Sequence, residues 1–153
     1  AVDAAEGGIQ SMLDDAAMAV MTLNGGSAVP LWNTWLDGLQ EEAPEGEEID
    51  VAGLKAIFAK ALEELEDMSG AKVGDKTMMD ALIPASEAVA AYTGDSADEL
   101  FDAAAQAAAQ GAEATKQYVS KFGRAKSYGT KTIGTPDAGA VSMSWFFQGL
   151  ARE

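Results

Sequence analysis

The chain has 153 residues, of which 25 are acidic and 10 basic, giving a formal net charge of −15. Because it contains neither histidine nor cysteine, it cannot by itself build a disulfide, a Cys/His zinc site, a thiol nucleophile or a Ser-His-Asp triad. Its negative charge argues against a nucleic-acid partner, and no apolar run reaches the roughly 18 residues of a membrane span. We expect one soluble domain over residues 1–153, in a reducing compartment such as the cytoplasm.

Helical periodicity begins near the start of the chain. Ile9, Met12, Leu13 and the apolar residues after them recur at i, i+3 and i+4, which predicts an amphipathic helix near residues 4–23. Two consecutive glycines then end this helix. A second helix is predicted to begin near Pro30, because proline suits the first helical turn.

The middle of the chain alternates an acidic segment with apolar stripes. Residues 41–50 hold six carboxylates without the spacing of a calcium-binding EF-hand loop, so we interpret them as a solvated loop. Residues 51–68 carry the strongest helical stripe. After a loop, a further helix is predicted over residues 75–92, with a kink or local irregularity at Pro84.

The last third begins with a helix-capping pattern. Ser96 and Glu99 form a capping box, which opens an alanine-rich helix predicted to run to about Lys121. Residues 123–136 are predicted to form a polar loop, and Asp137 is expected to be the N-cap of a final helix. Six helices and no convincing strand predict an all-α antiparallel bundle.

Two glycine-containing loops have features that helical periodicity does not explain. The first, residues 24–30, opens onto a helix and suits phosphate binding, but an ordinary helix–helix turn is the alternative. The second, residues 69–78, has two lysines and a hydroxyl ahead of a helix. It is not a P-loop because Asp75 separates Gly74 from Lys76, and it can also be an Asp-capped helix start.

The third loop, residues 123–140, and the residues just before it concentrate positive charge in an acidic chain. Four of the ten basic residues lie within eleven positions: Lys121, Arg124, Lys126 and Lys131. Such focusing favours an anionic ligand, and a solvated basic loop is the alternative.

These three segments resemble one known family. Residues 70–85, with Gly70-Ala71-Lys72 and Gly74-Asp75-Lys76-Thr77-Met78, closely resemble the G-x-A-K-P-G-D-K-T-M-x-D-A-x-x-P signature of the nucleotide-binding L subunit of dihydroxyacetone kinases. Residues 123–140 are similar to that family's G-R-A-S-Y loop, and residues 24–30 to its glycine turn. The segments follow the family's order and spacing, so the resemblance covers essentially the whole chain.

The resemblance implies a fold, an activity and partners. The family fold is an antiparallel helical barrel of about eight helices that binds ADP or ATP at one end. The phosphoryl group of bound ATP passes to dihydroxyacetone, which a histidine of a partner K-type subunit holds. In some members a phosphoprotein of the phosphotransferase system regenerates ATP from retained ADP, whereas others exchange free ATP. A homodimer is a further alternative for the assembly.

The resemblance also assigns nucleotide contacts residue by residue. Gly26 and Ser27 would form the turn against the phosphates, which Arg124 would also contact. Met78 would pack on the adenine, with Ser69 at a matching backbone position and the Thr77 hydroxyl close by. The pocket would be closed at the last helix by two residues, Asp137 and Gly139.

The main departure from the family concerns metal binding. The family's Asp-rich magnesium loop has no counterpart here, so the chain is expected to be N-terminally incomplete by about two helices. Mg²⁺ would then bind only if that upstream segment were supplied, and this chain alone would supply no catalytic residue and have little or no activity. The alternative is a shortened homologue that acts as a metal-free, catalytically silent helical scaffold or regulatory module.

Overall fold

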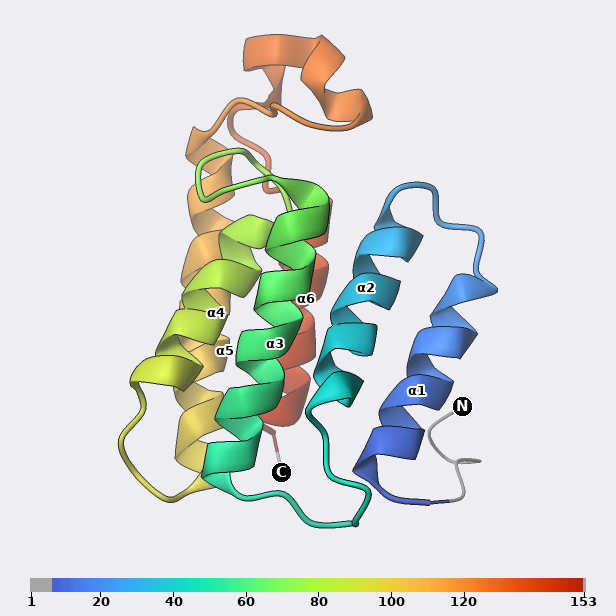
Figure 1. Ribbon diagram of the computed structural model, residues 1–153. Coiled ribbons are helices and arrows are strands. Elements are labelled where there is room, and N and C mark those ends of the chain that lie inside the picture. Colours follow the sequence, from blue (N-terminus) through green and yellow to red (C-terminus); the bar gives the residue numbers. More distant parts are fainter. Residues whose placement is uncertain (1–6, 153) are drawn as a thin grey trace. The chain divides into compact units, whose positions relative to one another are not determined.

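The computed structural model describes residues 7–152, whose regular structure consists of six α-helices and short 3-10 segments, without a strand. The prediction of an all-α helical protein with about six helices is confirmed. The chain divides into two compact units, Ala1–Gly70 and Ala71–Glu153, which are described separately (Figure 1). That the whole chain forms one domain stays a prediction. Within the described residues, no helix has the length and apolar character needed to cross a membrane.

The first unit consists of three antiparallel helices (Figure 1). Helix α1 (Ile9–Met21) packs on α2 (Ala28–Glu41), and α2 packs on α3 (Val51–Ser69). Trp35 of α2 is fully buried, and its ring centroid lies 6.1 Å from that of Phe58 in α3. This pair anchors the apolar core of the unit, because large aromatic side chains remove the most surface from water.

The ends of these helices differ slightly from the sequence-based expectation. Helix α1 begins after Gly8, and the first three residues of the predicted 4–23 helix lie outside the described residues. Helix α2 begins at Ala28, so Pro30 still lies within the first turn. Amides of the first turn have no intrahelical acceptor, so the missing N–H of proline costs no helical hydrogen bond there. Helix α3 begins at an N-cap, Asp50, whose carboxylate accepts a 2.7 Å hydrogen bond from the Gly53 amide.

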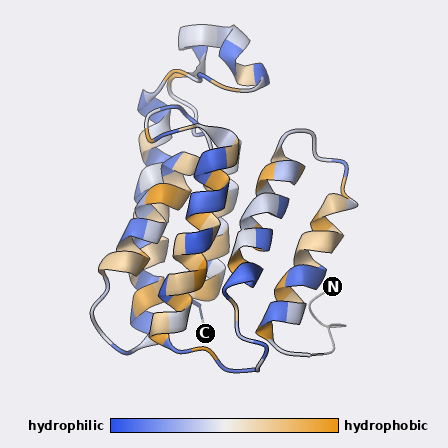
Figure 2. Ribbon diagram, viewed as in Figure 1, coloured by the Kyte–Doolittle hydropathy of each residue, from blue (hydrophilic) through white to orange (hydrophobic). Residues whose placement is uncertain are grey.

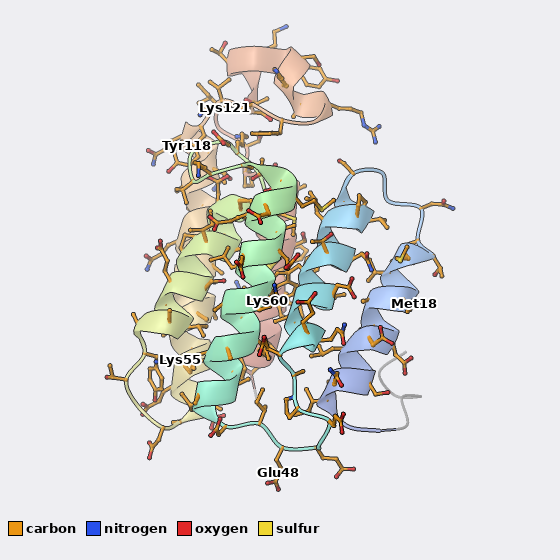
Figure 3. All side chains as sticks on the ribbon, viewed as in Figure 1. Met18, Glu48, Lys55, Lys60, Tyr118 and Lys121 are labelled. Atoms are coloured by element: carbon orange, nitrogen blue, oxygen red, sulfur yellow. The ribbon has the colours of Figure 1, made fainter. Side chains whose placement is uncertain are left out.

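The acidic segment between α2 and α3 is the predicted loop. Apart from Ala43, which is buried, its side chains are exposed or half-buried, and Glu48 points away from the helices (Figure 3). The carboxylates are therefore solvated, which keeps their mutual repulsion low.

The second unit also has three long helices, each of which contacts the other two. These are α4 (Met79–Ala91), α5 (Ala97–Ala114) and α6 (Ala138–Leu150). Four of the five buried residues of α5 are alanines, so the neighbouring helices can approach it closely. The helices carry hydrophobic and hydrophilic residues side by side, as amphipathic helices do (Figure 2). Two 3-10 segments, η2 (Thr115–Gln117) and η3 (Arg124–Thr132), connect α5 to α6 at one end of the unit (Figure 1).

The predicted start of α4 is wrong by four residues. The helix begins at Met79 rather than at Asp75, because the backbone of Lys76 is left-handed with φ 61° and cannot continue a helix. Pro84 lies inside α4 as expected, and the helix continues beyond it to Ala91.

The segment after α5 also differs from expectation. Helix α5 ends at Ala114 rather than near Lys121, and the chain becomes extended at Tyr118 after the single turn of η2. The predicted polar loop of residues 123–136 contains the 3-10 turns of η3, which are interrupted by a non-helical glycine, Gly129. Three glycines with positive φ, at positions 123, 129 and 134, allow the turns of this segment.

Candidate functional site

The loop of residues 70–78 is closed by a buried carboxylate from α4. Asp80 is 1% exposed, and its two carboxylate oxygens accept hydrogen bonds of 2.6 Å from the Gly74 amide and 2.7 Å from the Thr77 amide. These bonds satisfy amides ahead of the helix that have no intrahelical partner. The side chain of Asp80 therefore fixes both the loop and the start of α4.

A second carboxylate ties the same loop to the segment after α5. The Asp75 side chain accepts hydrogen bonds of 2.9 Å from the Lys72 amide and 2.6 Å from the Lys121 ammonium. The Lys121 amide also donates to the Asp75 carbonyl at 3.1 Å. The hydrogen bond from Lys121, and after it that from Lys72, lowers the pKa of Asp75. Lys121 lies at the same end of the unit as Tyr118 (Figure 3).

Helix α6 begins at the predicted N-cap. The Asp137 carboxylate accepts a 2.8 Å hydrogen bond from the Ala140 amide, and the Asp137 amide donates a 2.8 Å bond to the Thr115 hydroxyl. Burial raises the pKa of Asp137, which the amides at the start of α6 partly oppose. The nearby Asp80 carboxylate adds to the increase, and the Lys76 ammonium opposes it.

Three of the predicted nucleotide-binding residues meet at the start of α6. A Cβ atom on Gly139 would lie 3.2 Å from the Met78 Cβ and 3.0 Å from an Asp137 carboxylate oxygen. Thr77 is adjacent, and its hydroxyl accepts a 3.2 Å hydrogen bond from the Met79 amide. Met78 is only 4% exposed, so a base would have a small part of this side chain to contact.

Arg124 lies on η3 of the same unit and is exposed. It forms no ion pair with any residue of 7–152, and the same holds for Lys126 and Lys131. Lys121, the fourth basic residue of this segment, is paired with Asp75. Three cations on one exposed segment are thus available to an anion.

The other predicted residues belong to the first unit. Gly26 and Ser27 form an exposed turn before α2, with Gly26 at φ 59°. The Ser27 side chain does not cap the helix that follows it. Ser69 is the last residue of α3. Their role in nucleotide binding stays a prediction.

A cavity of about 260 Å³ lies between the start of α4 and the end of α5. Its lining includes Val73, Asp80, Gly111 and Tyr118. None of the predicted nucleotide-binding residues of the second unit lines it. Across residues 7–152, no group of three or more acidic side chains is arranged to hold a metal ion.

Sequence reasoning missed two residues that organise this end of the unit. Asp80 belongs to the segment that carries the family resemblance, and its position three residues after Thr77 was a local signal for a capping role. The buried Lys76 had no such signal, because its side chain contacts residues that are distant in sequence.

Comparison with known protein families gives a match over nearly the whole chain. The model of the DAK2 domain matches residues 1–152. The chain is 35% identical to an L-erythrulose kinase of Pectobacterium atrosepticum and 34% identical to a D-erythrulose kinase of Mycolicibacterium smegmatis. These matches cover 95% and 88% of this chain but 25% and 23% of the relatives, so the chain spans about a quarter of their length.

A shorter relative matches more completely. The chain is 30% identical to the protein named PEP-dependent dihydroxyacetone kinase 2, ADP-binding subunit DhaL, of Listeria innocua. That match covers 95% of this chain and 67% of the relative. The chain therefore belongs to the DAK2 domain family, as a DhaL-type domain.

Proposed function

We propose that the chain is the nucleotide-binding component of a cytoplasmic ketose kinase. It would bind ATP and pass the terminal phosphoryl group to dihydroxyacetone held by a K-type partner subunit, retaining ADP as a cofactor. The extent of the matches supports this role, because the segment shared with the long kinases is also the one shared with an ADP-binding subunit.

The observation that carries the proposal is the cluster of unpaired cations on η3. In a chain of net charge −15, Arg124, Lys126 and Lys131 are exposed within eight positions and have no ion-pair partner among residues 7–152. Charge-assisted hydrogen bonds from such groups are the usual way in which proteins hold phosphates. Arg124 would contact the phosphates directly, and Lys126 and Lys131 would raise the local concentration of the anion.

Met78, Thr77, Asp137 and Gly139 would bound the nucleotide at the start of α6. Gly26, Ser27 and Ser69 are further proposed nucleotide contacts. Phosphoryl transfer demands positioning and neutralisation of charge rather than covalent catalysis by these residues. Mg²⁺, when supplied with its own ligands, would neutralise charge on the phosphates.

Two ketoses are candidate substrates, and two routes are candidates for the supply of ATP. Erythrulose is a second candidate substrate, because the Pectobacterium and Mycolicibacterium relatives, at 35% and 34% identity, are named erythrulose kinases. ATP would be regenerated by a phosphoprotein of the phosphotransferase system or exchanged with free ATP. The name of the Listeria relative, PEP-dependent, favours the first route for that protein.

Calorimetric titration tests the proposal. ADP, ATP and inorganic phosphate are titrated into the chain with and without Mg²⁺, and we expect saturable binding of both nucleotides and much weaker binding of phosphate. Addition of a K-type subunit, together with an upstream segment that carries the Asp-rich loop, should then give ATP-dependent phosphorylation of dihydroxyacetone or erythrulose. Failure of both nucleotides to bind under either condition would contradict the proposal and favour a catalytically silent scaffold.

A further inference from the structure

Lys76 is a buried cation whose hydrogen bonds all go to backbone carbonyls. Its side chain is 4% exposed. The ammonium donates to the carbonyl oxygens of Thr115 at 2.7 Å, Thr132 at 2.7 Å and Thr135 at 2.6 Å. An ammonium has three N–H donors, so these bonds use its full hydrogen-bonding capacity. Lys76 forms no ion pair with any residue of 7–152.

The three carbonyls belong to segments that succeed one another along the chain. Thr115 follows the last residue of α5, Thr132 is the last residue of η3, and Thr135 lies two residues before the Asp137 cap of α6. We call residues 118–136 the basic loop. One ammonium therefore joins the entrance of the basic loop, the end of its 3-10 turns and its exit into α6.

The same residue connects the basic loop to the loop of residues 70–78. Thr77 and Met78 follow Lys76 directly, and its left-handed backbone, φ 61°, belongs to the turn that precedes α4. Both the burial of an ammonium and a left-handed conformation at a non-glycine residue oppose folding. Such features persist where the surrounding structure fixes them, and they concentrate at functional sites.

We propose that Lys76 is a positioning residue for the nucleotide. It holds the basic loop in the conformation in which Arg124 and the start of α6 reach the same phosphates, and it does not touch the ligand because its donors are already used. This inference rests on the proposed nucleotide-binding function. The other bonds of the loop, such as the 2.7 Å bond from the Gly134 amide to the Lys116 carbonyl, support its ends but do not join all three segments.

The test compares Lys76→Met with Lys60→Met. Lys60 is a control in the first unit, where its ammonium forms ion pairs with three carboxylates, those of Glu41, Glu63 and Glu64. ADP affinity is measured by calorimetry, and amide hydrogen exchange is followed by region, at a temperature where circular dichroism shows full helix content. For Lys76→Met we expect a Kd at least tenfold higher and at least tenfold faster exchange in the basic loop, with exchange in α5 unchanged. Lys60→Met should match the wild type in ADP affinity and in hydrogen exchange of the basic loop.

A conservative variant separates positioning from simple stabilisation. Lys76→Arg keeps the charge and donors, and it should recover part of the lost affinity and loop protection. The proposal is overturned if folded Lys76→Met binds ADP within twofold of the wild type, or if exchange accelerates equally in α5 and in the basic loop. If Lys76→Met does not fold, Lys76→Gln is judged by the same criteria, and failure of both to fold overturns the positioning role in favour of a general structural one.

The experiment also distinguishes this inference from the proposed function. If neither the wild type nor Lys60→Met binds ADP, the nucleotide-binding proposal is wrong, and a positioning role for a nucleotide falls with it. If both bind ADP and Lys76→Met binds equally well, only the Lys76 inference is wrong.

Discussion

The carbonyl oxygen of Asp80 in α4 occupies the space that a side chain on Gly111 in α5 would need. A Cβ atom on Gly111 would lie 1.9 Å from that oxygen and 3.1 Å from the Ala81 Cα. The two helices therefore meet backbone to backbone at the first turn of α4. Because the Asp80 side chain also holds the loop of residues 70–78, the helix contact and the loop depend on one residue.

Gly111→Ala should destabilise the second unit. The added methyl group must push α4 and α5 apart, which typically costs about 1–3 kcal/mol and outweighs the gain in helix propensity. Gly149→Ala in α6 is the control, because a Cβ atom there has no neighbour within 4 Å. It should stabilise the protein by up to about 1 kcal/mol. Urea unfolding followed by circular dichroism measures both, and equal stability of the two variants would contradict the close contact.

Arg124→Ala should weaken nucleotide binding without unfolding the protein. The side chain is exposed and unpaired within residues 7–152, so its loss should change the free energy of unfolding by less than about 0.5 kcal/mol. A charge-assisted bond to phosphate contributes about 1.5–3 kcal/mol, which corresponds to a Kd at least tenfold higher. Calorimetry with ADP measures the effect, with Arg152→Ala as the control for charge. An unchanged affinity removes Arg124 from the site.

The helices and their caps could be predicted because they depend on local sequence. The Ser96 hydroxyl accepts a 3.3 Å bond from the Glu99 amide, as the capping box predicts. The reverse bond of the box is replaced, since the Ser96 amide donates to the Tyr92 hydroxyl, which donates to the Glu99 carboxylate. Tyr92 lies beyond the four-residue pattern, so the pattern could not show its part.

The end of α5 and the start of α4 depend on contacts that periodicity does not contain. The apolar spacing of Met78, Met79 and Leu82 is compatible with a helix from residue 75, and only the left-handed Lys76 excludes it. Residues 115–121 have no strong helix breaker, but the Thr115 carbonyl accepts a hydrogen bond from Lys76 and the Thr115 hydroxyl accepts one from the Asp137 amide. The meeting of Met78 with Gly139 likewise joins segments sixty-one positions apart, which the family resemblance indicated and local patterns could not.

Lys121→Met should lower stability in a pH-dependent way. The Lys121 ammonium lowers the pKa of Asp75, so the pair stabilises the folded state above the ordinary carboxyl pKa of about 3.9. This stabilisation is lost as the pH falls through the lowered pKa. At pH 7 the variant should be less stable by up to about 1 kcal/mol, since Lys121 is largely exposed.

Lys126→Met is the matched control for the loss of positive charge, because Lys126 has no ion-pair partner among residues 7–152. Urea unfolding at pH 7 and pH 3 should show a difference between the two variants that shrinks at pH 3. A difference that is the same at both values would rule out the ion pair as its cause.

Asp137→Asn should become more stable relative to the wild type as the pH rises. Burial raises the pKa of Asp137 in the folded state, so its favourable contribution is present below the unfolded pKa and is lost as the pH rises through the folded pKa. Asparagine caps helices as well as aspartate and carries no charge, whereas Asp137→Ala should be about 1 kcal/mol less stable than Asp137→Asn at every pH. Urea unfolding between pH 3 and 7 measures all three proteins. If the wild type instead becomes more stable relative to Asp137→Asn as the pH rises, the amides at the start of α6 outweigh burial, and the ionised carboxylate stabilises the helix.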